Sequence, residues 1–94
     1  MMQIVSNQRP DLIKCCITRV GAHDLLRYDK FTLGYLWRSD YGSTDNKMHF
    51  MNLFKLSPLQ NIPIKTEKYP ATLIITADHD TRVVPSINFI FNFN

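Results

Sequence analysis

A dense group of ionisable side chains in this sequence is Asp78-His79-Asp80-Thr81-Arg82. It comes directly after Thr72–Thr76, a compact apolar stretch that predicts a buried strand. Open parallel sheets bind ligands past the carboxyl ends of their strands, so this position favours a functional loop. A carboxylate in such a loop can orient a histidine that activates a serine or a cysteine. The sequence therefore offers a candidate acid for nucleophilic catalysis.

The partners that this acid would need are not evident. None of the serines stands in Gly-x-Ser-x-Gly, the strained turn that exposes a hydrolase nucleophile. Hydrolases with that turn place their histidine after the acid, and no histidine follows Asp80. His79 is a poor substitute, because the side chains of sequence neighbours diverge. The serines are Ser6, Ser39, Ser43, Ser57 and Ser86.

Metal and disulfide chemistry are not expected. Asp78, His79 and Asp80 are consecutive, and three consecutive residues rarely converge on one ion. Cys15 and Cys16 are also neighbours, and a disulfide between them would need a strained ring. We interpret both cysteines as reduced, buried thiols of a cytoplasmic protein. We expect no metal and no cofactor.

The elements that must position the acidic loop follow from apolar patterning and chain breakers. Leu12–Val20 is rich in β-branched residues and predicts a largely buried strand that ends at Gly21. Asp45–Leu56 predicts a helix with its N-cap among residues 43–45. With Thr72–Thr76, the pattern gives an α/β fold in which two parallel strands are joined by a helical crossover and the sheet is incomplete. The helix residues expected in the core are Met48, Phe50, Met51 and Phe54.

The other segments predict shorter elements. Met1–Gln8 is interpreted as the last turns of a helix, because the residue before Pro10 is disfavoured in the α region. His23–Trp37 predicts short helical turns over a surface cleft, and Asn61–Pro70 has loop composition. His23 and His49 are expected to be structural or solvent-facing.

Length, charge and hydropathy exclude several classes of protein. Ninety-four residues, 45% hydrophobic and 20% charged, fit one small globular domain or part of one. The net charge is +3, but no two basic residues are adjacent, which argues against nucleic-acid binding. No apolar run reaches the roughly 18 residues that span a bilayer, and Met1–Arg9 does not have the pattern of a secretory signal. We expect neither a nucleic-acid partner nor membrane association.

Five blocks of the sequence carry a specific resemblance. They are Asn7-Gln8-Arg9-Pro10-Asp11-Leu12, Val20-Gly21, Asp40-Tyr41-Gly42, Ser57-Pro58-Leu59 and Thr76–Pro85. In the same order and at similar spacing, they resemble the peptidase domain of the prolyl oligopeptidase family, over roughly Gln3 to Pro85. The resemblance implies part of an α/β-hydrolase domain, which a β-propeller caps in the family. It also implies a serine endopeptidase that cleaves short proline-containing peptides after proline with a Ser-Asp-His triad.

The resemblance assigns roles to individual residues. Asp80 matches the triad aspartate, and Arg82 matches an arginine that hydrogen-bonds the substrate backbone. Trp37 matches the indole that stacks on the substrate proline ring, while Tyr41 and Val83 match other walls of that pocket. A rigid carboxylate, a flat guanidinium and an aromatic face suit these tasks. We expect Asp80, Arg82, Trp37 and Tyr41 to meet past the carboxyl end of the second strand.

The last residues depart from the family pattern. Thr81 stands where an acidic residue is common. Residues 86–94 alternate apolar and polar side chains where the family has a helix, so we expect a partial peptidase domain over residues 1–85 and a divergent tail over residues 86–94. The preceding context nevertheless predicts that the residues after Pro85 begin as a helix.

Two functions stay open at this point. By resemblance, the nucleophile lies just before Met1 and the catalytic histidine beyond Asn94, so the chain alone is expected to be inactive. The first function is that of a serine-peptidase fragment that holds the triad acid and part of the proline pocket. The alternative is a non-catalytic remnant that docks to other chains, including copies of itself, through unpaired sheet edges.

Overall fold

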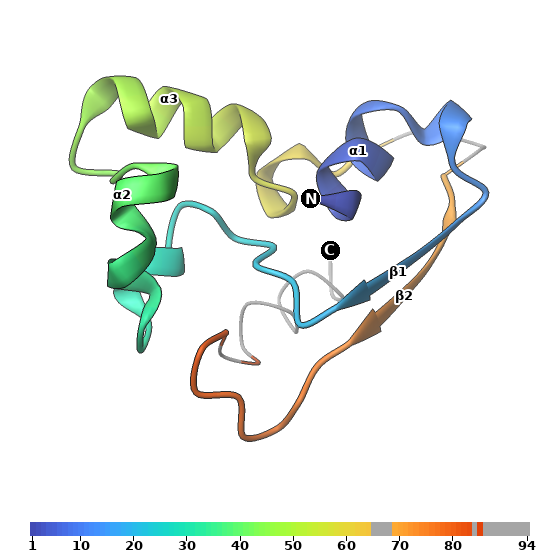
Figure 1. The fold of residues 1–94 in the computed structure, drawn as a ribbon. Helices are drawn as coiled ribbons and strands as arrows, with labels where there is room; N and C mark the ends of the chain where they lie inside the picture. The colour runs from blue at the N-terminus through green and yellow to red at the C-terminus, as the bar shows by residue number, and fades with distance from the viewer. Residues whose placement is uncertain (65–68, 84, 86–94) are drawn as a thin grey trace.

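The computed structural model describes residues 1–64, 69–83 and 85, and its helices and strands alternate as in an α/β protein (Figure 1). The helices are α1 (Met2–Gln8), α2 (Arg38–Tyr41) and α3 (Lys47–Leu56), and the strands are β1 (Cys15–Arg19) and β2 (Ala71–Ile75). Four short 3-10 turns connect them: η1 (Pro10–Leu12), η2 (Tyr28–Lys30), η3 (Gly34–Trp37) and η4 (Leu59–Asn61).

The two strands pair in parallel, as the sequence predicts. Cys15 lies opposite Ala71 and Arg19 opposite Ile75, and the ladder continues where Val20 N donates to Ile75 O at 2.8 Å. The first strand begins later than expected, because Pro10–Leu12 fold into the turn η1. The result is an incomplete α/β sheet of two parallel strands with helices, in agreement with the predicted fold class.

The expectation of two largely buried strands is wrong for this structure. β1 buries only alternate residues, Cys16 and Thr18, on the face that α1 contacts. On the opposite face Ile17 is 60% exposed and Leu73 is 53% exposed, because no described element packs there. Figure 1 shows the helices on one side of the strand pair. The same alternation corrects the interpretation of the cysteines: both are free, but only Cys16 is buried and Cys15 is exposed.

Helix α3 differs from its prediction at the start and in its packing. Its N-cap is Asn46, whose side chain accepts from the backbone N–H groups of Met48 and His49 at 2.9 and 3.3 Å. Of its residues only Leu53 is buried, so the expected core role of the others is wrong. The amphipathic pattern is present, but within the described residues no element covers the rest of its apolar face. The exposed fractions are 76% for Met48, 37% for Phe50, 48% for Met51 and 44% for Phe54.

The most deeply buried residues include polar ones, and their hydrogen bonds join separate segments of the long crossover between β1 and β2. His23 and Ser57 are 1% and 0% exposed, and Leu59 N donates to His23 O at 2.9 Å. The Ser57 hydroxyl oxygen accepts from Leu25 N at 2.9 Å, so the end of α3 is fixed to the segment after β1. His23 therefore has a structural place and His49 is exposed, as expected.

Two expectations concern the ends and the membrane. The predicted helical start after Pro85 and the alternating pattern of residues 86–94 lie outside the described residues. Among the residues that are described, no helix is long and apolar enough to cross a membrane.

Candidate functional site

The loop after β2 is organised by the carboxylate of Asp80. Its Oδ1 atom accepts from the backbone N–H groups of Arg82 at 2.8 Å and Val83 at 3.0 Å. The bonds from Val83 and Arg82 favour the charged form and lower the pKa of Asp80 below its ordinary value. Both bonds end on Oδ1, so neither engages Oδ2. The half-buried Asp80 is therefore held as a carboxylate with one oxygen fixed by backbone.

His79 turns away from this carboxylate. Its Nδ1 atom lies 3.0 Å from Oδ2 of Asp78, and both side chains are at least 90% exposed. An ion pair between two exposed groups contributes little to stability. Asp78 is a sequence neighbour of His79, so the reason given for expecting that His79 does not serve Asp80, that neighbouring side chains diverge, is wrong for this pair. Among the described residues, no three His, Cys, Asp or Glu side chains are grouped so that they could hold a metal ion.

Three of the predicted pocket residues line one cavity. Trp37, Tyr41 and Val83 surround a space of about 600 Å³ that also has Leu25, Leu53 and Leu56 on its walls. Trp37 ends η3 and Tyr41 ends α2, which follows η3 directly, whereas Val83 lies in the loop after β2. Two segments far apart in the sequence therefore form the site. A cavity of this size with apolar and aromatic walls fits a small ligand or side chain. We refer to it as the aromatic cavity.

Asp80 and Arg82 do not line the aromatic cavity but stand in the same loop as Val83. A hydrogen bond ties this loop to the segment that precedes Trp37, because Thr32 Oγ1 donates to Arg82 O at 3.3 Å. In Figure 1 the loop after β2, coloured orange to red, curves back toward the α2 end of the molecule. The structure thus brings the predicted residues to one region while it separates the acid from the apolar walls.

Tyr28 belongs to the aromatic cavity and was not predicted. Its ring is 3% exposed and lies edge-on to Tyr41, with ring centroids 5.9 Å apart and an interplanar angle of 86°. Its hydroxyl group donates to Gly42 O, the carbonyl directly after α2. No local motif marks this residue, because both contacts are made with residues more than ten positions away in the chain.

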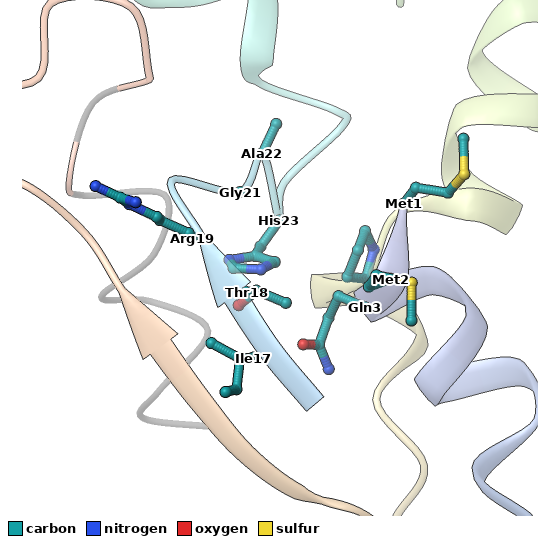
Figure 2. Close-up of a pocket in the computed structure, with 10 residues that line it drawn as sticks. Met1, Met2, Gln3, Ile17, Thr18, Arg19, Gly21, Ala22 and His23 are labelled. Carbon is teal, nitrogen blue, oxygen red and sulfur yellow. The ribbon is translucent and has the colours of Figure 1, made fainter. Parts of the chain in front are cut away.

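A second, smaller cavity lies between the start of α1 and the end of β1. Its volume is about 230 Å³, and Figure 2 shows Gln3 and His23 on its walls, with the His23 ring beside Gly21. The packing is close, because a methyl group added at Gly21 would lie 2.8 Å from Nε2 of His23. Met1 lines both this cavity and the aromatic cavity. The amino end of the chain therefore lies between the two.

A parallel strand pair with a carboxylate loop and an apolar cavity at its carboxyl end defines a piece of an α/β protein, and the cavity is a candidate ligand site at the usual edge of the sheet. The chain belongs to the prolyl oligopeptidase family, whose family model matches residues 1–91. The match extends beyond residue 85, and the expected boundary between a partial domain and a divergent tail stays a prediction.

Individual relatives support this membership. A prolyl endopeptidase of Dictyostelium discoideum is 46% identical over 91 residues, and prolyl oligopeptidase A of Galerina marginata is 52% identical over 75 residues. These matches cover 97% and 80% of this chain but only 12% and 10% of the two relatives. The chain therefore spans about an eighth or less of the curated relatives that it matches.

Solved structures show the same fold over the same span. One chain from a structural study of two prolyl endopeptidases superposes with a TM-score of 0.92 at 41% identity, covering 96% of this chain and 13% of that chain. Prolyl oligopeptidase B of Galerina marginata, bound to a 35-residue substrate, gives a TM-score of 0.78 at 34% identity and covers 95% of this chain and 13% of that one.

Proposed function

We propose that this chain is the part of a prolyl oligopeptidase that carries the acid of its catalytic triad and part of its proline pocket. The complete enzyme would be a serine peptidase that cleaves short peptides after proline. Membership in the family and the shared fold support this proposal. The observation that carries it is that Trp37, Tyr41 and Val83 line one cavity and that Val83 is hydrogen-bonded to Asp80.

Asp80 has the geometry that a triad acid needs. Such a carboxylate stays ionised, fixes the tautomer of the histidine and stabilises the imidazolium that forms during the reaction. Backbone N–H groups already hold Oδ1, and the Oδ2 atom is the one proposed to accept from Nδ1 of the histidine. The low pKa of Asp80 keeps that oxygen negative at neutral pH. The histidine and the serine would come from other parts of the complete enzyme.

The aromatic cavity is proposed to receive the proline side chain of the substrate. A pyrrolidine ring is compact, apolar and conformationally restricted, so it can pack on the flat face of an indole with little loss of conformational freedom. Trp37 supplies that face, and Tyr41 and Val83 close the sides. The exposed guanidinium of Arg82 would donate to a carbonyl of the peptide beside the cleaved bond.

The neighbourhood of Met1 fits this arrangement. Met1 lines the aromatic cavity, so a nucleophile on a segment directly before Met1 would lie at the mouth of the proline pocket. None of the described serines is placed to replace it. Ser6 and Ser57 are fully buried, and their hydroxyl groups donate to Met2 O at 3.1 Å and His23 O at 3.4 Å. The hydroxyl groups of Ser39 and Ser43 donate to Oδ1 of Asp40 at 3.4 Å and to Oδ2 of Asp45 at 3.1 Å. His49 Nδ1 accepts from the backbone N–H of Ser43 at 3.3 Å and not from its hydroxyl group.

The proposal is tested in two proteins. The first is the 94-residue chain, which should not cleave a fluorogenic peptide with proline before the reporter. The second is a chimera in which residues 1–91 replace the matching segment of the Dictyostelium discoideum prolyl endopeptidase. The chimera should cleave that peptide, and a serine-directed phosphonate should abolish the cleavage. Phosphonate-sensitive turnover by the 94-residue chain, or a folded chimera without activity, would overturn the proposal.

One observation favours the alternative of a docking piece. The sheet face that carries Ile17, Leu73 and Ile75 is open, and both strands have one edge without a partner among the described residues. Open edges pair readily with other strands. Sedimentation of the 94-residue chain distinguishes the two functions: self-association without prolyl-peptide binding in the aromatic cavity supports docking alone.

A further inference from the structure

We propose that Tyr28 and Asp29 are positioning residues that hold the segment from Trp37 to Gly42 in the orientation that recognises proline. The inference rests on the proposed function of the aromatic cavity and extends it. Neither residue belongs to the motifs from which the site was predicted. Both stand in η2, which contacts η3 directly.

Asp29 holds the beginning of α2. Its Oδ2 atom accepts from Nε of Arg38 at 2.9 Å, and its side chain is 0% exposed. Arg38 follows Trp37 directly and is the first residue of α2. The buried carboxylate therefore fixes the chain at the peptide unit next to the indole. Arg38 also lies 3.8 Å from Asp45, but Asp45 is 70% exposed, so that second pairing is weak.

Tyr28 holds the other end of the same helix. Its hydroxyl group donates to the carbonyl of Gly42, and its ring packs edge-on against Tyr41. Consecutive residues of η2 thus contact both ends of α2, which has only 4 residues. A helix of one turn is not stable in isolation, because nucleation costs more than so few hydrogen bonds return. The orientation of Trp37 and Tyr41 must therefore come from such outside contacts.

Stability alone does not explain why the charged side chain of Asp29 is buried. Among the described residues its Oδ1 atom has no hydrogen-bond partner, so desolvation of this charge is only partly offset by Arg38. Apolar residues of similar volume often replace a buried ion pair without loss of stability. By contrast, Arg9 and Asp11 form a bidentate pair whose side chains are more than half exposed. This pair lies between α1 and β1 and does not belong to α2 or to the segments beside it. The Asp29–Arg38 pair therefore holds the orientation of Trp37 at the aromatic cavity.

The first test uses Trp37, the single tryptophan of the chain, as a probe. The variants are Asp29→Asn and Tyr28→Phe, with Asp11→Asn as the matched control for loss of an arginine partner. Acrylamide quenching and fluorescence anisotropy of Trp37 are measured in the 94-residue chain. Greater quenching and lower anisotropy in the first two variants, with no change in the control, support the inference. Equal values in all the variants contradict it.

The second test measures kinetics in the chimera. Asp29→Asn keeps an amide oxygen that can accept from Arg38 but removes the negative charge of the pair. Charge-assisted hydrogen bonds are roughly twice as strong as neutral ones, so this loss should raise KM for a prolyl peptide by about tenfold. Because the cavity is proposed to hold the proline ring equally in the bound substrate and in the transition state, kcat should change little. A general folding defect would instead lower the amount of active enzyme and leave KM unchanged. An unchanged KM in Asp29→Asn would overturn the inference, as would equal quenching in the first test.

The outcomes separate this inference from the function on which it rests. If the unsubstituted chimera shows no preference for proline, the proposed function is wrong, whereas the comparison of Trp37 quenching still decides whether Asp29 holds the indole. If the 94-residue chain is unfolded by circular dichroism, the KM values of the chimera and its Asp11→Asn control decide the inference.

Discussion

The carboxylate Oδ1 of Asp80 accepts the backbone N–H of Val83 at 3.0 Å, so the candidate acid and one wall of the aromatic cavity share a single turn. The Thr32 hydroxyl group anchors this turn to the segment before Trp37 through the Arg82 carbonyl. A shift of the acid would therefore move the cavity wall as well. Under the proposed function, the candidate acid and the candidate proline pocket would therefore be coupled through the backbone.

Replacement of Asp80 by asparagine separates these two roles. The amide oxygen of Asn can still accept from Arg82 and Val83, so the turn should persist, but the side chain can no longer stabilise an imidazolium. In the chimera, Asp80→Asn should lower kcat on the order of 10⁴-fold with little change in KM. The control is Asp78→Asn, because Asp78 is 90% exposed and pairs only with His79 among the described residues. Equal losses in the two variants would rule out a special role for Asp80.

The low pKa of Asp80 predicts an acid transition of its loop. Hydrogen bonds from Val83 and Arg82 lower this pKa in the folded state, so ionised Asp80 contributes stability that is present above its unfolded pKa of about 4. That contribution is lost as pH falls through the lower folded value. NMR titration of the Arg82 and Val83 amides should give an apparent pKa below the ordinary aspartate value, and Asp80→Asn should abolish the transition. An apparent pKa at or above the ordinary aspartate value would contradict this prediction.

Loss of the Trp37 indole should weaken the selection of proline. In the chimera, Trp37→Ala should lower kcat/KM for a prolyl peptide by at least about tenfold, because an aromatic stacking contact and its apolar area are removed. The matching alanyl peptide should be affected much less. Tyr35→Ala is the control, since Tyr35 lies in the same turn but is 54% exposed and does not line the aromatic cavity. Unchanged discrimination between the two peptides would exclude the stacking role.

Gly34 is required where η3 crosses η2. A methyl group added at this residue would lie 1.9 Å from the carbonyl oxygen of Tyr28, which is backbone and cannot rotate away. Gly34→Ala should therefore lower the free energy of unfolding by about 1–3 kcal/mol, the usual cost of overpacking. Urea unfolding followed by Trp37 fluorescence measures it. Ser39→Ala, at an exposed residue of α2, should stay within about 0.5 kcal/mol.

The strands, the crossover helix and part of the site could be predicted from the sequence because local patterns encode them. β-Branched runs mark β1 and β2, and the blocks around Tyr41 and Asp80 mark the loops. The start of α3 was missed because Asp45 and Asn46 are both good caps, and only the hydrogen bonds to Met48 and His49 distinguish them. An apolar pattern shows which face of a helix avoids water but not what covers it, so the exposure of Met48 and Phe54 could not be predicted.

The contacts that orient the site depend on tertiary packing and could not be predicted from local sequence patterns. Tyr28 reaches Gly42 and Asp29 reaches Arg38, and in each pair the residues come together only because η2 and η3 pack at Gly34. No spacing rule links a tyrosine to a carbonyl fourteen positions away. Tertiary geometry decides such pairs, and a single sequence contains no separate signal for it.

Tyr69 joins helix α1 to the start of β2 and predicts a loss of stability at high pH. Its hydroxyl group accepts from Nε2 of Gln3 at 2.7 Å and donates to Oδ1 of Asn7. Burial raises the pKa of Tyr69 above its ordinary value, although the bond from Gln3 opposes the shift. A raised folded pKa means that the contribution to stability is complete below the unfolded pKa of about 10 and is lost as pH rises through the folded value.

Tyr69→Phe tests this prediction in the 94-residue chain. The variant removes the hydroxyl group and leaves Gln3 and Asn7 without it, which should cost about 1–3 kcal/mol at pH 7. It should also reduce the decline of stability between pH 9 and 11, measured by urea unfolding. Part of the decline should remain, because burial raises the pKa of Tyr28 as well. Tyr35→Phe, at an exposed ring, is the control. If Tyr69→Phe kept the whole alkaline decline, the Tyr69 hydroxyl group would not be the ionising group that links α1 to β2.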